Sequence, residues 1–230
     1  MNQLQIGFLI YPEVVQLDVM GAYQVLAFPP STQVHLIWKT LSPVVSNEGL
    51  VLTPTTTLAE CPPLDVICVP GGGIGQAEVM QDTEILDFLR QQSITAQYVT
   101  SVCTGSLILA AAGLLQGYKA TCHWAFQDQL AMLGVEVVPQ RVVIDRNRVT
   151  GAGVTSGIDF GLTLLGLLCG EQVAKMAQLM MEYRGMATIL EKCYHLDLKA
   201  LYRSTSRYAT FCSRHFPSHH RDILVRLSGT

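Results

Sequence analysis

The sequence is poor in charged and aromatic residues. Only 14% of its 230 residues are charged and 7% are aromatic, while 49% are hydrophobic. This balance excludes a disordered chain, because there is enough apolar material for a sizeable core, which must be largely aliphatic. The formal net charge of −3 excludes a general basic coat, so binding to nucleic acid is not expected.

Membrane-spanning and secretory features are also missing. The apolar run at 160–169 is about half as long as a bilayer requires, and the N-terminal run has no basic flank and breaks at Pro12. The seven cysteines are an odd number and form no CxxC pair, which favours free thiols over a disulfide framework. We therefore expect a cytoplasmic protein without a membrane association.

Apolar strand-like runs alternate with helix-length segments through most of the chain. Strands are predicted at 5–10, 34–38, 65–69 and 98–102, with a hairpin formed by 142–144 and 148–150. Helices are predicted at 18–27, 83–92, 105–112, 124–133 and 159–168. This order predicts an α/β fold with a doubly wound, mostly parallel sheet flanked by helices. The functional site of such a sheet lies beyond the carboxyl ends of its strands.

Charge divides the chain into two parts. Residues 1–182 carry a net charge of −8, whereas residues 183–230 carry +5. We interpret 1–182 as the α/β domain and 183–230 as a basic C-terminal tail. Met186, Ile189, Leu190 and Cys193 have helical spacing, so the tail can hold one amphipathic helix.

The most informative segment is YVTSVCTGSLIL, residues 98–109. A β-rich run ends at Cys103 and a small-residue helix follows at once, the layout of a nucleophile on a strand-to-helix turn. The helix N-terminus would direct N–H groups at the sulfur and lower its pKa. The alternative is that Cys103 is a small buried core residue.

Two further turns follow predicted strands. Glycines 71–73 in the PGGG segment allow close approach of the backbone, so Gly72 and Gly73 are candidates for substrate- or oxyanion-binding N–H groups. A plain strand-to-helix turn is the alternative. Asp18 stands at the start of a predicted helix, where it is either an N-cap or a catalytic carboxylate.

Three other polar positions have structural explanations. His123, in the ATCHW segment, is either a base or a histidine packed beside Trp124, and Cys122 is interpreted as packing, though near enough to the site to remain a candidate. Asp159 is interpreted as a helix cap. No His, Cys, Asp or Glu cluster has zinc spacing, so no metal is implied.

Four segments, in order and spacing, resemble the ThiJ/PfpI superfamily: FLIYPEVVQLDVMG, LDVICVPGGG, YVTSVCTGSLILAAAGLLQGYKATCHWAF and VTGAGVTSGIDFGLTLL. The resemblance covers roughly residues 4–182 and implies the class I glutamine amidotransferase-like (flavodoxin-like) fold.

Within the superfamily, the Cys-Thr-Gly-Ser form together with Gln-Leu-Asp near the N-terminus is similar to the isocyanide (isonitrile) hydratase family. The resemblance implies a homodimer that converts isocyanides to N-substituted formamides without a metal or organic cofactor. It assigns Cys103 as the nucleophile, with Asp18 and Thr104 as supporting residues. A thiolate would add to the isocyanide carbon, Asp18 would protonate that carbon, and water would then hydrolyse the thioimidate. Thr104, Gly72 and Gly73 would orient water or stabilise polar intermediates.

Two rival functions share much of this pattern. Regulators of the AraC type carry a similar domain with the CTG and HW motifs, but two helix-turn-helix units need about 100 residues and only 48 follow Glu182. A stress-related thiol hydrolase, glyoxalase or redox sensor of the superfamily would use the same Cys103. The tail also departs from the hydratase pattern after Tyr183, and a reading-frame change in the gene is one hypothesis for this.

Overall fold

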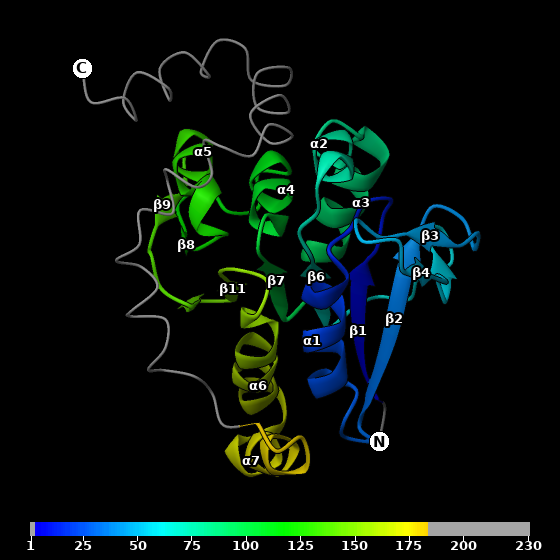
Figure 1. Ribbon diagram of the computed structural model, residues 1–230, viewed down its shortest axis with the longest axis vertical. Coiled ribbons are helices and arrows are strands. Elements are labelled where there is room, and N and C mark those ends of the chain that lie inside the picture. The colour runs from blue at the N-terminus through cyan, green and yellow to red at the C-terminus, as the bar shows by residue number, and fades with distance from the viewer. Residues whose placement is uncertain (1–2, 184–230) are drawn as a thin grey trace. The chain divides into compact units, whose positions relative to one another are not determined.

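The computed structural model describes residues 3–183, and Figure 1 shows their arrangement. Within these residues a seven-stranded sheet has the order β10-β11-β7-β6-β1-β2-β5. The strands are β1 (Leu4–Leu9), β2 (Thr32–Trp38), β5 (Thr56–Thr57), β6 (Val66–Val69), β7 (Tyr98–Val102), β10 (Val142–Asp145) and β11 (Arg148–Gly151). Neighbouring strands are parallel except for the β10–β11 hairpin. The predicted mostly parallel α/β sheet is confirmed.

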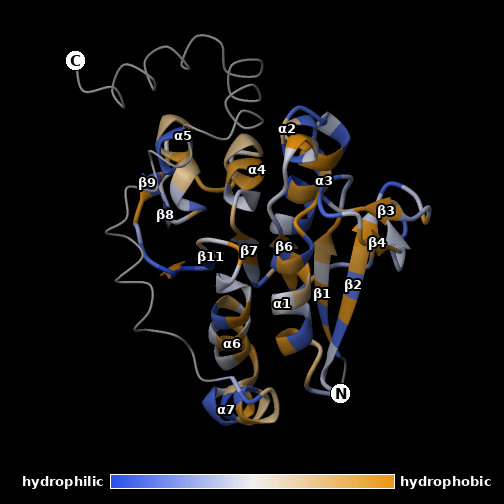
Figure 2. Ribbon diagram, viewed as in Figure 1, coloured by the Kyte–Doolittle hydropathy of each residue, from blue (hydrophilic) through white to orange (hydrophobic). Residues whose placement is uncertain are grey.

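The central strands are continuous apolar runs because both of their faces are covered. All four residues of β6 are buried, as are the last four residues of β1 and of β7. Figure 2 shows the apolar residues gathered on these strands. In the register, Phe8 pairs with Cys68 and Cys68 with Thr100, so the carboxyl ends of β1, β6 and β7 lie at one edge.

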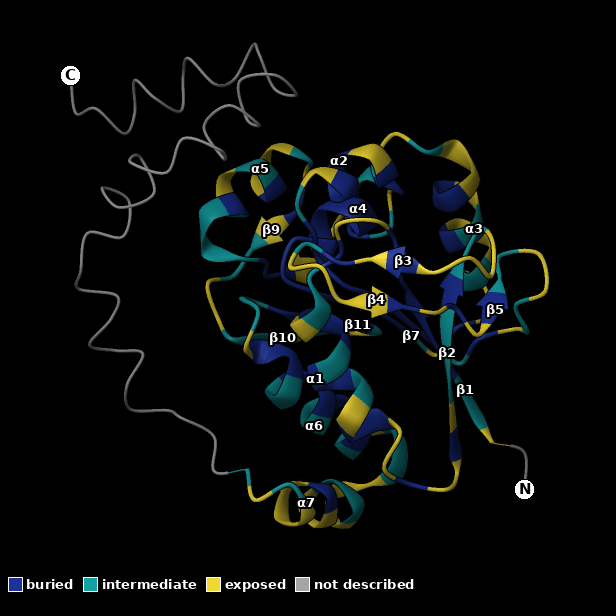
Figure 3. Ribbon diagram, turned by 45° about the vertical axis from the view of Figure 1, so that its right-hand side comes forward, coloured by how far each residue is buried: buried dark blue, intermediate teal, exposed yellow. Residues whose placement is uncertain are grey.

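Helices cover the sheet on two sides. Helices α1 (Gln16–Leu26) and α6 (Ser156–Cys169) lie on one side, and α2 (Ile74–Val79), α3 (Thr83–Ser93) and α4 (Gly105–Ala111) lie on the other (Figure 3). Gly157 and Gly161 of α6 face α1, and a Cβ at Gly161 would stand 3.0 Å from Val25 Cβ. Small residues therefore bring α1 close to α6, and α1 carries Asp18.

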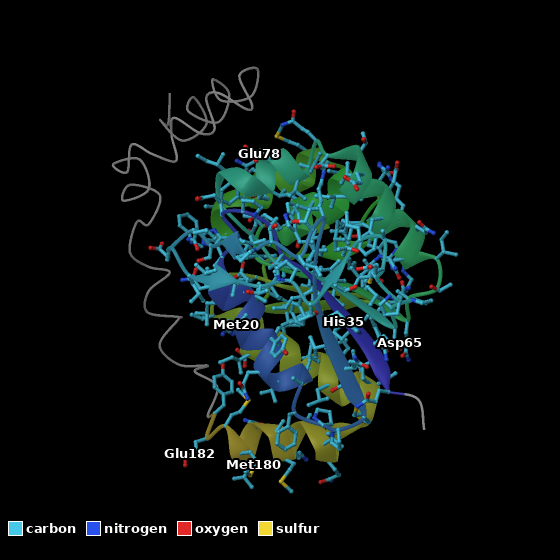
Figure 4. The ribbon with its side chains drawn as sticks, turned by 90° about the vertical axis from the view of Figure 1, so that its right-hand side faces the viewer. Met20, His35, Asp65, Glu78, Met180 and Glu182 are labelled. Atoms are coloured by element: carbon cyan, nitrogen blue, oxygen red, sulfur yellow. The ribbon has the colours of Figure 1, made fainter. Side chains whose placement is uncertain are left out.

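Several short elements complete the described fold. They are β3 (Val44–Val45), β4 (Val51–Leu52), β8 (Lys119–Ala120), β9 (Glu136–Val137), the 3-10 helix η1 (Trp124–Phe126), α5 (Gln127–Met132) and α7 (Glu171–Met180). Figure 4 shows Met180 and Glu182 at the end of α7. Periodicity did not predict α2, α7 or the two-residue strands, because they are too short or too polar to stand out. The predicted helix at 124–133 is instead divided into η1 and α5.

The interpretation of Asp159 as a helix cap is wrong, and so is the N-cap alternative for Asp18. Helix α6 begins at Ser156 with Thr155 as its N-cap, so Asp159 is inside the first turns. The Asp159 carboxylate accepts from Arg141 Nε at 2.5 Å and from the Tyr183 hydroxyl at 2.8 Å. Asp18 is likewise inside α1, whose N-cap is Val15. Asp159 therefore accepts hydrogen bonds from outside its own helix, and so does Asp18, from the Gly71 N–H.

The structure bears on the expected absence of a membrane span but hardly on the C-terminal tail. No helix within residues 3–183 has the length and apolar character needed to cross a bilayer. The proposed amphipathic helix at 186–193, and all but the first residue of the basic tail, lie outside the described residues.

Candidate active site

Cys103 stands at a strained turn between β7 and α4. Its φ is +59°, in the left-handed region that non-glycine residues seldom adopt, and its N–H donates to Gly151 O at 3.0 Å. Gly105 begins α4 so close to β6 that a Cβ there would overlap the Val69 carbonyl oxygen. The strand, turn and small residues predicted from the sequence thus form the expected elbow. An ordinary core position would not require the strained φ of Cys103.

Asp18 lies against Cys103 although the two are 85 positions apart. Helix α1 buries Asp18 completely and brings its carboxyl group within hydrogen-bonding and charge range of the Cys103 thiol. Asp18 Oδ2 accepts the Gly71 N–H at 3.0 Å, while Oδ1 receives no N–H or O–H donor from the described residues. One carboxylate oxygen is thus fixed by the backbone and the other is available for proton exchange.

The buried pair resists ionisation. Burial raises the pKa of Asp18 from 3.8 to about 7, although the Gly71 N–H and the Cys103 thiol favour its carboxylate. Burial and the Asp18 charge raise the pKa of Cys103 well above its ordinary value, although the Thr104 N–H stabilises the thiolate. The predicted lowering of the Cys103 pKa is therefore wrong for the resting site, because burial outweighs the helix N-terminus. Above about pH 7 the pair keeps one proton and a single negative charge.

Replacing Asp18 should expose the stability cost of burying this carboxyl group. Because its pKa is higher in the folded state than the unfolded value of 3.8, folding becomes less favourable as pH rises from about 4 to 7. Asp18→Asn should therefore unfold at higher urea than the wild type at pH 8, by roughly 4 kcal/mol in unfolding free energy, and the gain should shrink toward pH 4. Exposed Asp87→Asn is the control. An Asp18→Asn variant no more stable than the wild type at pH 8 would contradict the raised pKa.

The three glycines after β6 have different roles. Gly71 N–H binds Asp18, Gly72 N–H donates to Thr104 Oγ1 at 3.1 Å, and Gly73 N–H donates to Glu13 O at 3.1 Å. Both groups predicted to contact substrate, at Gly72 and Gly73, therefore already have partners within the protein. Thr104 Oγ1 also donates to Gly72 O at 3.3 Å, so Thr104 ties this turn to the elbow.

Gly71 should tolerate no side chain. A Cβ there would stand 2.6 Å from Thr104 Oγ1 and 2.9 Å from Asp18 Oδ2, so the site would have to shift. We expect Gly71→Ala to cost about 1–3 kcal/mol in unfolding free energy and to displace Asp18 from Cys103. Gly73→Ala is the matched control, since its Cβ would meet only Glu13 Oε2, at 3.9 Å. Equal urea midpoints for the two variants would show that Gly71 is not constrained.

Cys122 lies near Cys103, and both His123 and Cys122 have local partners. His123 Nδ1 accepts the Ala125 N–H at 3.3 Å and caps η1, and its ring packs near Trp124 with centroids 5.6 Å apart. Burial lowers the pKa of His123 and raises that of Cys122 to about 12. Cys122 Sγ contacts His123 O at 3.3 Å. Within residues 3–183 no three His, Cys, Asp or Glu side chains form a group that could hold a metal.

Sequence reasoning missed Tyr11. This tyrosine follows β1, is fully buried and donates its hydroxyl to Pro70 O at 2.9 Å. Burial and the charges of Asp18 and Cys103 raise its pKa well above 10, so the phenol stays protonated. The signal available in the sequence was its place at the carboxyl end of a central strand, the same signal that indicated Gly71 and Cys103.

A model of the DJ-1/PfpI family matches residues 5–167, which contain every residue of this site. The chain belongs to the DJ-1/PfpI family. It is 58% identical over 180 residues to the isonitrile hydratase of Pseudomonas putida, covering 78% of each chain. The resemblance to isocyanide hydratases drawn from the motifs is thus confirmed.

Other proteins are similar to this chain in sequence or in fold. The chain is 32% identical to the HTH-type transcriptional regulator GbdR of Pseudomonas aeruginosa, matching 75% of this chain but about half (49%) of the regulator. A ThiJ/PfpI family protein from Pseudomonas syringae superposes with a TM-score of 0.78 at 44% identity, covering 81% of this chain and 77% of that one. Drosophila melanogaster DJ-1beta, at 21% identity and a TM-score of 0.74, covers 80% of this chain and 100% of its own and shows the fold alone.

Proposed function

We propose that this protein hydrates isocyanides to N-substituted formamides through a covalent adduct on Cys103. The observation that carries the proposal is the buried Asp18–Cys103 pair on a chain 58% identical to an isonitrile hydratase. An isocyanide carbon must accept both a nucleophile and a proton. A thiol and a carboxylate that share one proton are suited to deliver both.

The first half of the reaction adds the thiol across the isocyanide carbon. The Asp18 carboxylate takes the proton of Cys103 while the sulfur forms a bond to carbon. Asp18 then gives this proton to the same carbon, and R–N≡C becomes the thioimidate R–N=CH–S–Cys103. Because the site starts and ends this half with one negative charge, no thiolate has to persist in the buried pocket.

The second half is hydrolysis. Asp18, again a carboxylate, takes a proton from water as the water oxygen attacks the thioimidate carbon, and passes that proton to the nitrogen. The C–S bond of the tetrahedral adduct then breaks and releases R–NH–CHO, while the proton of the adduct's hydroxyl group passes through Asp18 to the Cys103 sulfur. The backbone N–H of Thr104 hydrogen-bonds to the Cys103 sulfur and stabilises the thiolate as the C–S bond breaks.

The homodimer is what the family resemblance implies, whereas the compartment is inferred from the cysteines. We propose a homodimer in the cytoplasm with a small-molecule isocyanide as substrate. The five cysteines within residues 3–183 are free thiols, which is the state that a reducing compartment maintains.

The test of this function is formation of formamide from an aryl isocyanide by the purified full chain. We expect the N-aryl formamide to accumulate to many times the enzyme concentration. Absence of turnover by folded protein would favour a thiol hydrolase or a sensor domain. The regulator alternative has weaker support, since identity to GbdR is 32%.

A further inference from the structure

A single peptide unit connects Tyr11 to Asp18. The carbonyl of Pro70 accepts the Tyr11 hydroxyl at 2.9 Å, and the N–H of Gly71, in the same peptide unit, donates to Asp18 Oδ2 at 3.0 Å. The described residues contain no cis peptide, so this carbonyl and N–H point in opposite directions. Tyr11 and Asp18 therefore hold the two ends of one peptide plane.

The position of Tyr11 is itself firmly fixed. It lies directly beyond β1, its ring packs near Trp38 with centroids 6.4 Å apart, and its carbonyl accepts the Val14 N–H. A Cβ at Gly72 would come within 2.7 Å of the Tyr11 ring, so this ring fills the space that the glycine leaves. A rigid phenol can thus determine which way the neighbouring peptide faces.

We propose that Tyr11 is a positioning residue that fixes the Pro70–Gly71 peptide so that its N–H faces the Asp18 carboxylate. Without the hydroxyl, the Pro70 carbonyl loses its buried donor, and the peptide can rotate away from Asp18 to satisfy it. Hydrogen bonds at the two ends of a peptide also polarise each other, so Tyr11 strengthens the Gly71 N–H as a donor.

The groups that face Asp18 determine the direction of the expected change. They are the Gly71 N–H, the Cys103 thiol and the protonated Tyr11 phenol, and no cation is among the influences on Asp18 within the described residues. The Gly71 N–H stabilises the carboxylate and opposes the effect of burial. Weakening this bond must therefore raise the pKa of Asp18 above about 7.

The experiment is an infrared titration of the Asp18 carboxyl band in Tyr11→Phe, assigned by subtracting Asp18→Asn. We expect the Asp18 pKa to rise by about one unit relative to the wild type. Tyr23→Phe is the matched control, because Tyr23 lies on α1 with its ring 6.2 Å from that of Phe8 rather than against the Pro70–Gly71 peptide. A folded Tyr11→Phe protein with an unchanged or lowered Asp18 pKa would overturn the proposal, since loosened packing alone would reduce burial and lower this pKa rather than raise it.

A second substitution covers the case in which Tyr11→Phe does not fold. Difluorotyrosine at position 11 keeps the shape and is a stronger donor, so the Asp18 pKa should fall; an unchanged value overturns the proposal. The spectroscopic result does not depend on isocyanide turnover, whereas the effect on catalysis rests on the proposed function. If the enzyme is active, the acid limb of kcat/KM should shift upward with the infrared pKa in Tyr11→Phe.

Discussion

Replacing Cys103 with alanine is expected to lower kcat for isocyanide hydration by about 10⁴-fold or more. The covalent adduct cannot form without the Cys103 sulfur. Asp18, whose proposed role is proton transfer, does not replace the sulfur as the nucleophile that bonds to the substrate carbon. The fold should survive, because alanine removes only the thiol from a position that is already 4% exposed and already at positive φ. Steady-state formamide production measures the loss.

Cys103→Ser is the matched control for this variant. Serine keeps a hydroxyl at nearly the same place but is a much weaker nucleophile at neutral pH, so it should also be inactive while matching the wild type in urea unfolding. Residual activity near the wild-type level in either variant would mean that Cys103 is a structural residue, and that another group carries the reaction.

Asp18→Asn is expected to lower kcat by about 10²–10⁴-fold, the range for loss of a positioned acid–base group. The amide oxygen can still accept the Gly71 N–H, so the geometry is retained while proton transfer is lost. The variant should keep Cys103 in place but leave no group to take its proton or to deliver one to the isocyanide carbon.

The pH dependence provides an independent check on Asp18. The wild-type kcat/KM should fall as pH drops below about 7, because a protonated Asp18 cannot accept the thiol proton. Asp18→Asn should lose this acid limb along with most of the rate. Persistence of the same limb in the variant would assign the titration to a different group.

The sheet and the elbow were predictable because their signals are local. Buried strands such as 98–102 are short apolar runs, and small residues after Cys103 permit the sharp turn into α4. The close approach of Asp18 to Cys103 came from resemblance, since no local rule brings positions 85 apart into contact. Periodicity indicated which edge of the sheet was functional, and the motifs indicated which residues met there.

The remaining features depend on the orientation of backbone N–H groups and on the depth of burial, which a sequence does not encode locally. PGGG predicted backbone N–H groups at the site, but only the fold shows that Gly71 binds Asp18 while Gly72 and Gly73 have other partners. The direction of the Cys103 pKa was missed for a similar reason. A helix N-terminus is visible in the sequence, whereas the depth of burial that outweighs it depends on packing from α1 and the sheet.

Covalent catalysis at Cys103 is tested most directly by a single-turnover experiment, quenched in acid, that follows protein mass and formamide together. We expect the peptide containing Cys103 first to gain the mass of one isocyanide molecule and then to lose it as formamide appears. Cys103→Ala should show neither event. Release of formamide with unmodified Cys103 at every quench time, together with turnover by Cys103→Ala, would contradict covalent catalysis at this site.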